Sequence, residues 1–333
     1  MNRKIRVMAL AAATLLASAA ASAATPGATN ALPVGRCVNM GNHLEPPQEG
    51  AWGRAIADDD FAIIAKAGFA TIRLPVRWSG HLDAAGRIDP AFLQRVQRVV
   101  GLARAAGLNV ILNDHNFDAL MSAPEANRDK LAAIWRQVAK AFADSPRDHV
   151  WFEIANEPHD KLTNANLVAT LSPALAAIRE SNPDRPVIVG GEFWSGVSSL
   201  ATLQLPEDPH LVPTFHYYEP FDFTHQGATW VEPVRPLGRV YGSEADKAML
   251  EADVAKVRAF IARTGKTPLL GEFGAIDLAP LAQRVAYAKA VRTAFDAVGV
   301  ATCSWAYTNT FPLYDSKAKQ WLPGMLEAVG AGQ

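Results

Sequence analysis

The chain has 333 residues, of which 49% are hydrophobic and 20% are charged, and its net charge at neutral pH is −1. This is the composition of a globular protein, and it excludes a disordered chain, a collagen-like chain and a coiled coil. Because no excess of positive charge is present, we expect no nucleic-acid partner. The two cysteines exclude a disulfide-rich scaffold, and they form no clustered pattern of the kind that binds structural zinc.

The first 23 residues have the layout of a secretory signal peptide. A basic start is followed by an apolar stretch at residues 7–17 and by the small residues Ala-Ser-Ala at 21–23, which predict cleavage after Ala23. An N-terminal membrane anchor is the alternative, but the apolar stretch is shorter than the roughly 20 residues of a membrane span. We therefore expect a secreted or periplasmic protein with no membrane partner, in which residues 24–333 form one domain.

Short apolar segments alternate with helical ones along this domain. Strands are predicted at residues 34–39, 70–74, 109–112, 150–154, 187–189, 211–215, 268–270 and 301–304. Helices are predicted at residues 58–67, 90–106, 128–142, 166–180, 245–263 and 281–298. Such alternation predicts a parallel sheet buried on both faces, and eight units suit a single-domain (β/α)₈ TIM barrel of the α/β class. An open doubly wound sheet is the alternative, but no glycine-rich phosphate loop follows the first strand.

Polar and aromatic residues stand at or just after the ends of six of these strands. They are Arg73, His115, Asn156, Glu157, His216, Tyr218, Glu272 and Trp305. The active sites of (β/α)₈ enzymes lie at the carboxyl ends of the strands, so we expect these side chains to converge. Two of them are carboxylates, and cleavage of a glycosidic bond requires such a pair at one site.

Five segments resemble glycoside hydrolase family 5, the cellulase family of retaining (β/α)₈-barrel glycosidases. They are Val-Asn-Met-Gly-Asn at 38–42, Thr-Ile-Arg-Leu-Pro at 71–75, Ile-Ala-Asn-Glu-Pro at 154–158, His-Tyr-Tyr at 216–218 and Leu-Leu-Gly-Glu-Phe-Gly at 269–274. The segments occur in the family's order and span nearly the whole predicted domain. One departure is Asn116, where many family members carry a second histidine or a glycine, which leaves the substrate contact at that position undefined.

The resemblance implies that Glu157 is the general acid/base and Glu272 the nucleophile. Because the family's members retain the anomeric configuration, the two carboxyl groups should stand about 5–5.5 Å apart. A nearby cation lowers the pKa of a carboxyl group, so Arg73 should keep Glu272 ionised, and Tyr218 should donate a hydrogen bond to the same group. Burial and the negative charge of Glu272 should raise the pKa of Glu157.

The remaining residues of the resemblance are expected to hold the sugar. Asn156 would bond the 2-hydroxyl, His115 and His216 would hold other hydroxyls and the acid/base, and Trp305 would be the stacking floor. Each has a structural alternative. Arg73 could be an ion-pair partner, the histidines could be core residues or metal ligands, and Trp305 could be core packing.

We therefore expect an endo-β-1,4-glucanase that acts on an oligo- or polysaccharide as a monomer, without a cofactor or metal. The same fold and mechanism on mannan, xyloglucan, β-1,3-glucan or β-1,6-glucan is the main alternative. A non-catalytic glycan-binding barrel would have lost a glutamate, and an esterase would carry a Gly-x-Ser-x-Gly elbow, which the sequence lacks. A metal-dependent barrel hydrolase would show a ligand cluster.

The cysteines and the tryptophans allow two further predictions. Cys37 and Cys303 lie in the first and eighth predicted strands, which are neighbours if the barrel closes, so the thiols should be close. Whether they form a disulfide stays open at this point, because the geometry of such a bond is demanding. Four tryptophans, at positions 52, 78, 194 and 230, fall in loops and are candidate sugar subsites, whereas Trp135 and Trp151 should lie in the core.

Overall fold

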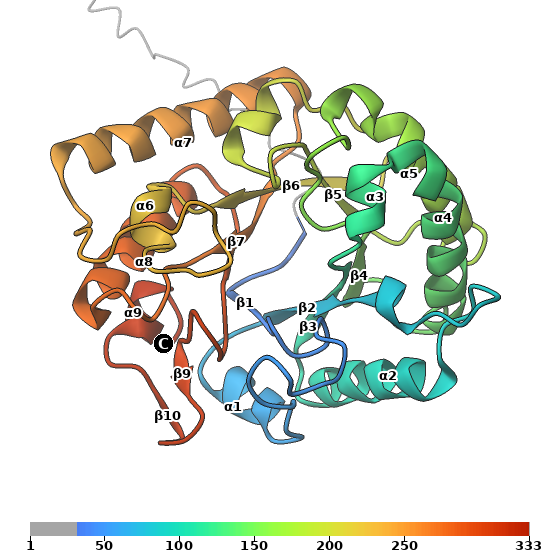
Figure 1. The fold of residues 1–333 in the computed structure, drawn as a ribbon, viewed down its shortest axis with the longest axis horizontal. Helices are drawn as coiled ribbons and strands as arrows, with labels where there is room; N and C mark the ends of the chain where they lie inside the picture. The colour runs from blue at the N-terminus through green and yellow to red at the C-terminus, as the bar shows by residue number, and fades with distance from the viewer. Residues whose placement is uncertain (1–31, 333) are drawn as a thin grey trace, which may run out of the picture.

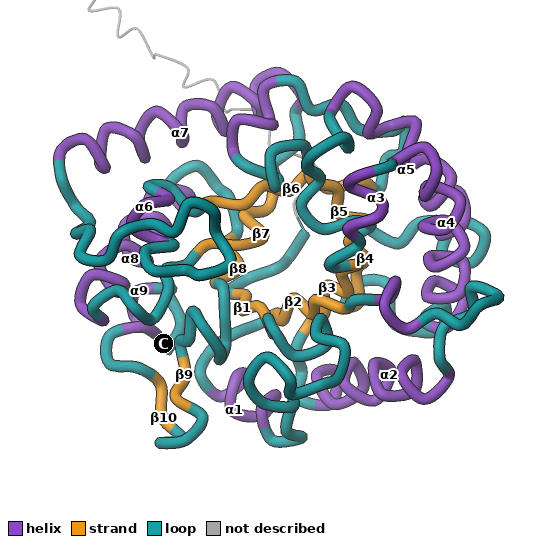
Figure 2. Tube along the Cα trace, viewed as in Figure 1, coloured by secondary structure: helices purple, strands orange, loops and turns teal. Residues whose placement is uncertain are grey.

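The computed structural model describes residues 32–332, and the predicted signal peptide lies outside this range. Eight parallel strands close into a barrel in sequential order, with helices around it, as Figure 1 and Figure 2 show. The strands are β1 (Cys37–Asn39), β2 (Thr71–Val76), β3 (Asn109–Asp114), β4 (Val150–Glu153), β5 (Val187–Gly190), β6 (Leu211–Tyr217), β7 (Leu269–Phe273) and β8 (Thr302–Ser304). The predicted (β/α)₈ TIM barrel is confirmed.

The main helices of the outer layer are α1 (Asp60–Lys66), α2 (Pro90–Ala105), α4 (Pro124–Ala141), α5 (Asn164–Arg179), α7 (Glu244–Thr264) and α8 (Leu281–Asp296). Shorter elements lie in the connections: α3 (Asp118–Ser122), α6 (Phe221–Thr224), α9 (Met325–Ala328), the 3₁₀ turns η1 (Trp78–His81) and η2 (Val197–Ala201), and the hairpin strands β9 (Tyr314–Asp315) and β10 (Gln320–Trp321). Each main helix was predicted to within a few residues. Within residues 32–332, no helix is both long and apolar enough to cross a membrane.

Local sequence explains where these helices begin and which face they bury. At α2, the Asp89 side chain accepts a hydrogen bond from the Ala91 backbone N–H, and Pro90 occupies the first turn, where no N–H partner is needed. Val96, Val99 and other apolar residues at helical spacing are buried against the barrel.

The barrel interior is divided into an apolar layer and a polar layer. At the amino-terminal end, Cys37, Ile111, Trp151 and Leu269 form part of a buried apolar cluster. Successive inward positions on a strand are two residues apart, so the residues one step further along the strands form the next layer. These are Asn39, Asn113, Glu153 and Gly271, with Arg73 following Thr71 on β2. The polar layer is therefore enclosed between the apolar floor and the open mouth.

Cys37 and Cys303 lie opposite each other in the register of β1 and β8 and are joined by a disulfide. Their Cα atoms are 4.3 Å apart, which confirms the predicted proximity. The bond links the first and last strands at the seam of the barrel, within its apolar floor.

Three details of the sequence prediction are wrong. Strand β2 continues through Pro75 instead of ending before it. A proline has no backbone N–H, and at this position the N–H would face β1. Because the pairing of β1 with β2 ends at Asn39, no hydrogen bond is lost there. His216 and Glu272 lie within β6 and β7 and not beyond them. Trp78 is fully buried in η1 with its ring 5.8 Å from that of Phe92, so it is not a sugar subsite.

Candidate active site

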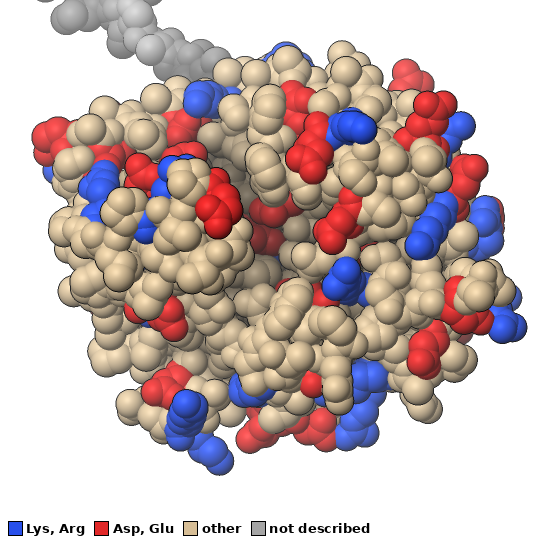
Figure 3. Space-filling model, viewed as in Figure 1, with Lys and Arg blue, Asp and Glu red and all other residues tan. Residues whose placement is uncertain are grey.

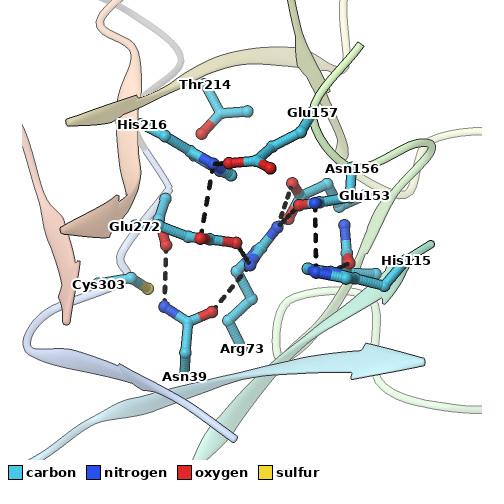
Figure 4. A network of polar contacts seen from close by, with 12 residues as sticks. Asn39, Arg73, His115, Glu153, Asn156, Glu157, Thr214, His216, Glu272 and Cys303 are labelled. Atoms are coloured by element: carbon cyan, nitrogen blue, oxygen red, sulfur yellow. Dashed lines mark hydrogen bonds and ion pairs between the residues drawn. The ribbon is translucent and has the colours of Figure 1, made fainter. Parts of the chain in front are cut away.

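The structure brings all eight sequence-predicted site residues together at the carboxyl ends of the strands. Figure 3 shows a hollow over the centre of the barrel with acidic side chains in its depth, and Figure 4 shows the network of polar contacts among the site residues. Trp135 and Trp151 are buried as predicted. Trp52, Trp194 and Trp230 are about half exposed, at 45%, 55% and 59%, and remain candidate subsites.

A β-bulge directs Glu272 into the barrel. On β7 the inward residues are Leu269 and Gly271, so strict alternation would point Glu272 outward to the helices. The register between β6 and β7 shifts instead, and His216 pairs with Glu272 although Phe215 pairs with Leu270. A bulge adds one residue to a strand and re-aims the side chains that follow. Glu272 consequently faces the interior, 4% exposed.

Both carboxylate oxygens of Glu272 accept hydrogen bonds. Arg73 Nη1 donates to Oε1 at 2.6 Å, and the Tyr218 hydroxyl donates to Oε2 at 2.8 Å. Burial raises the pKa of Glu272, while His216, Arg73 and the Tyr218 hydrogen bond act to lower it. Arg73 lowers the pKa of Glu272, as expected. The net shift of this pKa is nevertheless upward, because the loss of hydration on burial has the larger effect. The anionic form is still the one that these donors stabilise.

Glu157 follows β4 and has a left-handed backbone conformation, with φ at 46°. Its side chain keeps 23% of its surface exposed, and its Oε1 is 2.7 Å from His216 Nδ1. Burial raises the pKa of Glu157 to about 7. The nearby Arg73 and His159 lower this pKa, and Glu153 raises it. Glu157 thus has a site that favours its protonated form near neutral pH, unlike Glu272, which has an arginine in direct contact.

The two carboxyl groups are close enough for direct nucleophilic chemistry. One oxygen of Glu157, one oxygen of Glu272 and one ring nitrogen of His216 all lie within 4.8 Å of one another. Retaining glycosidases hold their carboxyl groups about 5–5.5 Å apart, whereas inverting enzymes need about 6.5–9.5 Å to admit a water molecule. The spacing favours the retaining geometry.

Hydrogen-bond partners assign the proton on His216. Its Nδ1 faces Glu157 at 2.7 Å and Glu272 at 3.7 Å, whereas its buried Nε2 has no partner. Burial lowers the pKa of His216, so the ring is neutral at neutral pH. An unpaired buried N–H is costlier than an unpaired acceptor position on the same ring, so the hydrogen belongs on Nδ1. His216 then donates to Oε1 of Glu157, which leaves Oε2 to carry the carboxyl proton.

Arg73 organises the rest of the polar layer, and its partners include a residue that sequence reasoning missed. Nε and Nη2 donate to the two oxygens of Glu153 at 2.6 and 2.8 Å, Nη2 donates to Asn156 Oδ1 at 2.6 Å, and Nη1 donates to Asn39 Oδ1 at 2.8 Å. Glu153 stands four residues before Glu157 in an apolar strand. The only signal for it was a buried-strand position occupied by a carboxylate.

The contact with Arg73 fixes the orientation of the Asn156 amide, and that orientation decides which ring nitrogen of His115 carries the hydrogen. Because an arginine only donates, Asn156 must present Oδ1 to Arg73, which directs its Nδ2 to His115 Nε2 at 3.3 Å. His115 then donates from Nδ1 to Asn113 Oδ1 at 2.7 Å. The His115 ring lies nearly parallel to that of Trp305, with centroids 5.9 Å apart. Trp305 is 9% exposed and belongs to a buried apolar cluster with Ala306 and Phe311, so its role as a stacking floor stays a prediction.

A metal at this site would need Glu157, His216 and Glu272, which are the one group of possible ligands among the residues that the structure describes. Arg73 and Tyr218 already occupy both oxygens of Glu272. A cation placed there would face the guanidinium charge at short range, which is repulsive. The donor set therefore suits acid–base chemistry better than metal binding.

The His216 ring packs against Gly271, in space that a larger side chain at this position would occupy. A Cβ atom at this position would lie 3.0 Å from His216 Nε2 and 2.8 Å from Thr214 Oγ1. We expect Gly271→Ala to displace the ring from the two carboxylates and to lower kcat/KM by about 10- to 100-fold, because small misplacements of reacting groups are costly. Gly101→Ala is the matched control, since a Cβ there meets nothing within 4 Å. Equal activity of the two variants would contradict this role.

Comparisons with known proteins identify one family. A family model described as "Cellulase (glycosyl hydrolase family 5)" matches residues 36–311. Among curated proteins, Endoglucanase H of Acetivibrio thermocellus is 32% identical over 305 residues, which cover 89% of this chain and 33% of that protein. Cellulase/esterase CelE of the same organism is 30% identical and is covered to 39%. The chain thus spans about a third of the length of these curated relatives.

Solved structures of similar proteins match over nearly their full length. A hyperthermophilic endo-β-1,4-glucanase in complex with substrate is 39% identical with a TM-score of 0.86, covering 89% of this chain and 97% of that one. Thermotoga maritima Cel5A, solved with cellobiose and with mannotriose, is 36% identical with a TM-score of 0.86 and the same coverage.

Proposed function

The chain belongs to glycosyl hydrolase family 5 and is a glycoside hydrolase, and we propose that it cleaves internal β-1,4 bonds of a glucan with retention of configuration. The observation that carries this proposal is that an oxygen of Glu157 and an oxygen of Glu272 lie within 4.8 Å of each other, although only Glu272 is in direct contact with an arginine. Glu272, contacted by an arginine, is the nucleophile. Glu157, whose burial favours the protonated form, is the general acid/base.

In the first step, a carboxylate oxygen of Glu272 attacks the anomeric carbon while Glu157 gives its proton to the glycosidic oxygen. The carbon–oxygen bond breaks, the leaving sugar departs as an alcohol, and a covalent glycosyl–enzyme forms. Arg73 and Tyr218 hold the attacking carboxylate in a fixed orientation. Once Glu272 is esterified, its negative charge is gone, and the pKa of Glu157 falls because the repulsion between the two groups ends.

In the second step, Glu157 acts as the base. It accepts a proton from water, whose oxygen attacks the anomeric carbon and releases Glu272 as a carboxylate. The sugar has then undergone two inversions and keeps its β configuration. In this proposal the second N–H of the Asn156 amide contacts the 2-hydroxyl of the bound sugar, Trp305 stacks on the ring, and His216 holds Glu157 in position. Both ring nitrogens of His115 already have partners, Asn113 and Asn156, so His115 orients the Asn156 amide instead of holding a sugar hydroxyl.

We predict a bell-shaped dependence of kcat/KM on pH. Activity rises as Glu272 ionises, on a limb above the ordinary carboxyl value of 4.5 because burial raises its pKa, and falls as Glu157 loses its proton with a pKa of about 7. Both limbs belong to the coupled pair. Initial rates on an aryl β-cellobioside between pH 4 and 9 test this, and a flat profile would contradict two-carboxylate chemistry.

A hydrolysis panel tests the substrate. We expect purified protein to release reducing ends from carboxymethyl cellulose and lichenan, and to lower the viscosity of the former early in the reaction, as an endo-acting enzyme does. Laminarin, xyloglucan and mannan are the comparison substrates, and mannan is a second candidate because a similar enzyme was solved with mannotriose. Activity on none of the five, in a folded protein, would reject the proposal. Unchanged rates with a chelator would support a metal-free mechanism.

We also propose that the protein is exported. The basic and apolar layout of the first 23 residues supports this, and so does the disulfide between Cys37 and Cys303, since disulfides are rare in the cytosol. Amino-terminal sequencing of the protein recovered from outside the cytoplasm should begin at Ala24. An intact amino terminus in the cytosolic fraction alone would reject export.

A further inference from the structure

The side chain of Glu153 is enclosed in the polar layer, 1% exposed, on the strand that leads to Glu157. Its two oxygens bind Arg73 side-on, through Nε at 2.6 Å and Nη2 at 2.8 Å. Arg73 is itself fully buried, so neither charge is screened by solvent. In Figure 4 the Arg73 guanidinium lies between Glu153 on one side and Glu272 on the other.

The five N–H donors of Arg73 are all in use. Two go to Glu153, and the other three go to Asn39, Asn156 and Glu272. A guanidinium is planar, so the side-on contact with Glu153 fixes the direction of the three remaining donors. One points at Oε1 of Glu272, and another sets the amide of Asn156. Glu153 thus determines how Arg73 meets the nucleophile.

Glu153 also changes the charge that the catalytic pair experiences. Arg73 carries one positive charge and contacts two carboxylates, so the buried group of Arg73, Glu153 and ionised Glu272 has a net charge of −1. Without Glu153 the net charge would be zero. A negative environment disfavours ionisation of Glu157 and stabilises the positive charge that develops on the sugar in the transition state.

We propose that Glu153 is a positioning residue for this reaction, which orients Arg73 toward the nucleophile and keeps the site negative, so that Glu157 holds its proton and Glu272 remains reactive. The inference rests on the proposed function, because it concerns the same two carboxylates. It assigns a third carboxylate to the site, one that transfers no proton and forms no bond to the sugar.

The other charged and titratable groups around Glu157 do not replace this charge. Arg73 on β2 and His159 in the loop after β4 lower the pKa of Glu157. His115 after β3 and His216 on β6 are kept neutral by burial, which lowers the pKa of both. Glu272 on β7 is partly neutralised by direct contact with Arg73. Glu153 and Glu272 therefore share the single positive charge of Arg73, and Glu153 supplies the second carboxylate that leaves the group negative.

The test is the pH profile of Glu153→Gln on a cello-oligosaccharide, whose sugar leaving group needs the proton of Glu157. Both limbs should move to lower pH, the alkaline limb by about half a unit or more, because an uncompensated Arg73 favours both carboxylates in their ionised forms. We expect kcat to fall on the order of tenfold, below the roughly 100- to 1,000-fold lost with a direct transition-state contact. Glu153→Asp, which keeps the charge, should restore the alkaline limb even if kcat stays low.

Asp60→Asn is the matched control. Asp60 is also a buried carboxylate with a two-bond arginine contact, to Arg54 at 2.7 and 2.8 Å, but it lies on α1 outside the barrel. Asp60→Asn should lower the free energy of unfolding without moving either limb of the pH profile. An alkaline limb in Glu153→Gln that coincides with that of the wild type would overturn the proposal, as would a shift of the same size in Asp60→Asn.

A direct titration separates this inference from the proposed function and covers the case in which Glu153→Gln does not fold. Carboxyl ¹³C NMR of the wild type, with the Glu157 signal identified by its loss in Glu157→Gln, measures the Glu157 pKa without any substrate. Asn39→Asp adds a carboxylate at the opposite edge of Arg73 and should raise that pKa. An unchanged pKa would overturn the role of Glu153, whereas a wild type inactive on every β-glucan would overturn only the proposed function.

Discussion

Glu272→Ala is expected to reduce kcat/KM by about four orders of magnitude or more while leaving the fold intact, because loss of a covalent nucleophile removes the first chemical step. The variant loses the Arg73 and Tyr218 contacts of the carboxylate but keeps the bidentate pair of Arg73 with Glu153. Circular dichroism and rates on an aryl β-cellobioside measure the two effects separately.

Added azide should partly restore the activity of Glu272→Ala. Azide attacks the anomeric carbon from the side that Glu272 occupied, the aryl leaving group departs, and the product is an α-glycosyl azide. Glu157→Ala should instead form a β-glycosyl azide, since azide then attacks the intermediate on Glu272. The configuration of the azide product, read by NMR, assigns the two roles independently of rate.

Glu180→Ala is the control for both variants, because Glu180 is a glutamate on the helical layer that pairs with Arg136 at about half exposure. It should keep wild-type activity and give no azide product. Full activity in Glu272→Ala or Glu157→Ala, or azide products of the opposite configurations, would reject the assignment of nucleophile and acid.

Reduction of the disulfide between Cys37 and Cys303 is expected to cost about 2–5 kcal/mol of stability, because the bond restricts the unfolded chain over 266 residues. For a chain of this size, that corresponds to a melting temperature lower by about 3–8 °C. Guanidinium unfolding of the same protein, refolded with and without reductant, measures the loss without introducing a cavity.

The control for this experiment is the double variant Cys37→Ala/Cys303→Ala, whose unfolding midpoint should not respond to reductant. Alkylation of the denatured, unreduced wild type followed by mass measurement should find no free thiol. Two free thiols, or identical midpoints for the oxidised and reduced wild type, would contradict the stabilising role of the bond.

The strands and helices were predictable because they depend on short-range patterns. Buried strands are apolar runs, and the helices carry one apolar face, so β4 and α2 appeared close to their observed bounds. The exceptions are residues whose conformation or burial depends on a neighbouring element of the fold. Pro75 lies inside β2 only because β1 has ended, and Trp78 is buried because η1 packs over Phe92.

The position of the two glutamates at the barrel mouth was predictable for a different reason. Glu157 and Glu272 stand in segments that resemble those of a known family, and their position near strand ends implies a shared barrel mouth. Glu153 had no comparable signal. A glutamate in an apolar strand shows that a partner must exist, since a lone buried charge is costly, but nothing local identifies that partner.

The sequence by itself determined the order of the elements, the (β/α)₈ fold class and the types of side chain at the strand ends, because these follow from periodicity and from one βα unit after another. Only the tertiary structure decided which atoms meet. Arg73 finds Glu153, Asn156 and Glu272 at separations of 80, 83 and 199 residues. These contacts depend on strand register, on barrel closure and on the bulge that turns Glu272 inward, and such long-range geometry leaves no trace in local hydrophobic patterns.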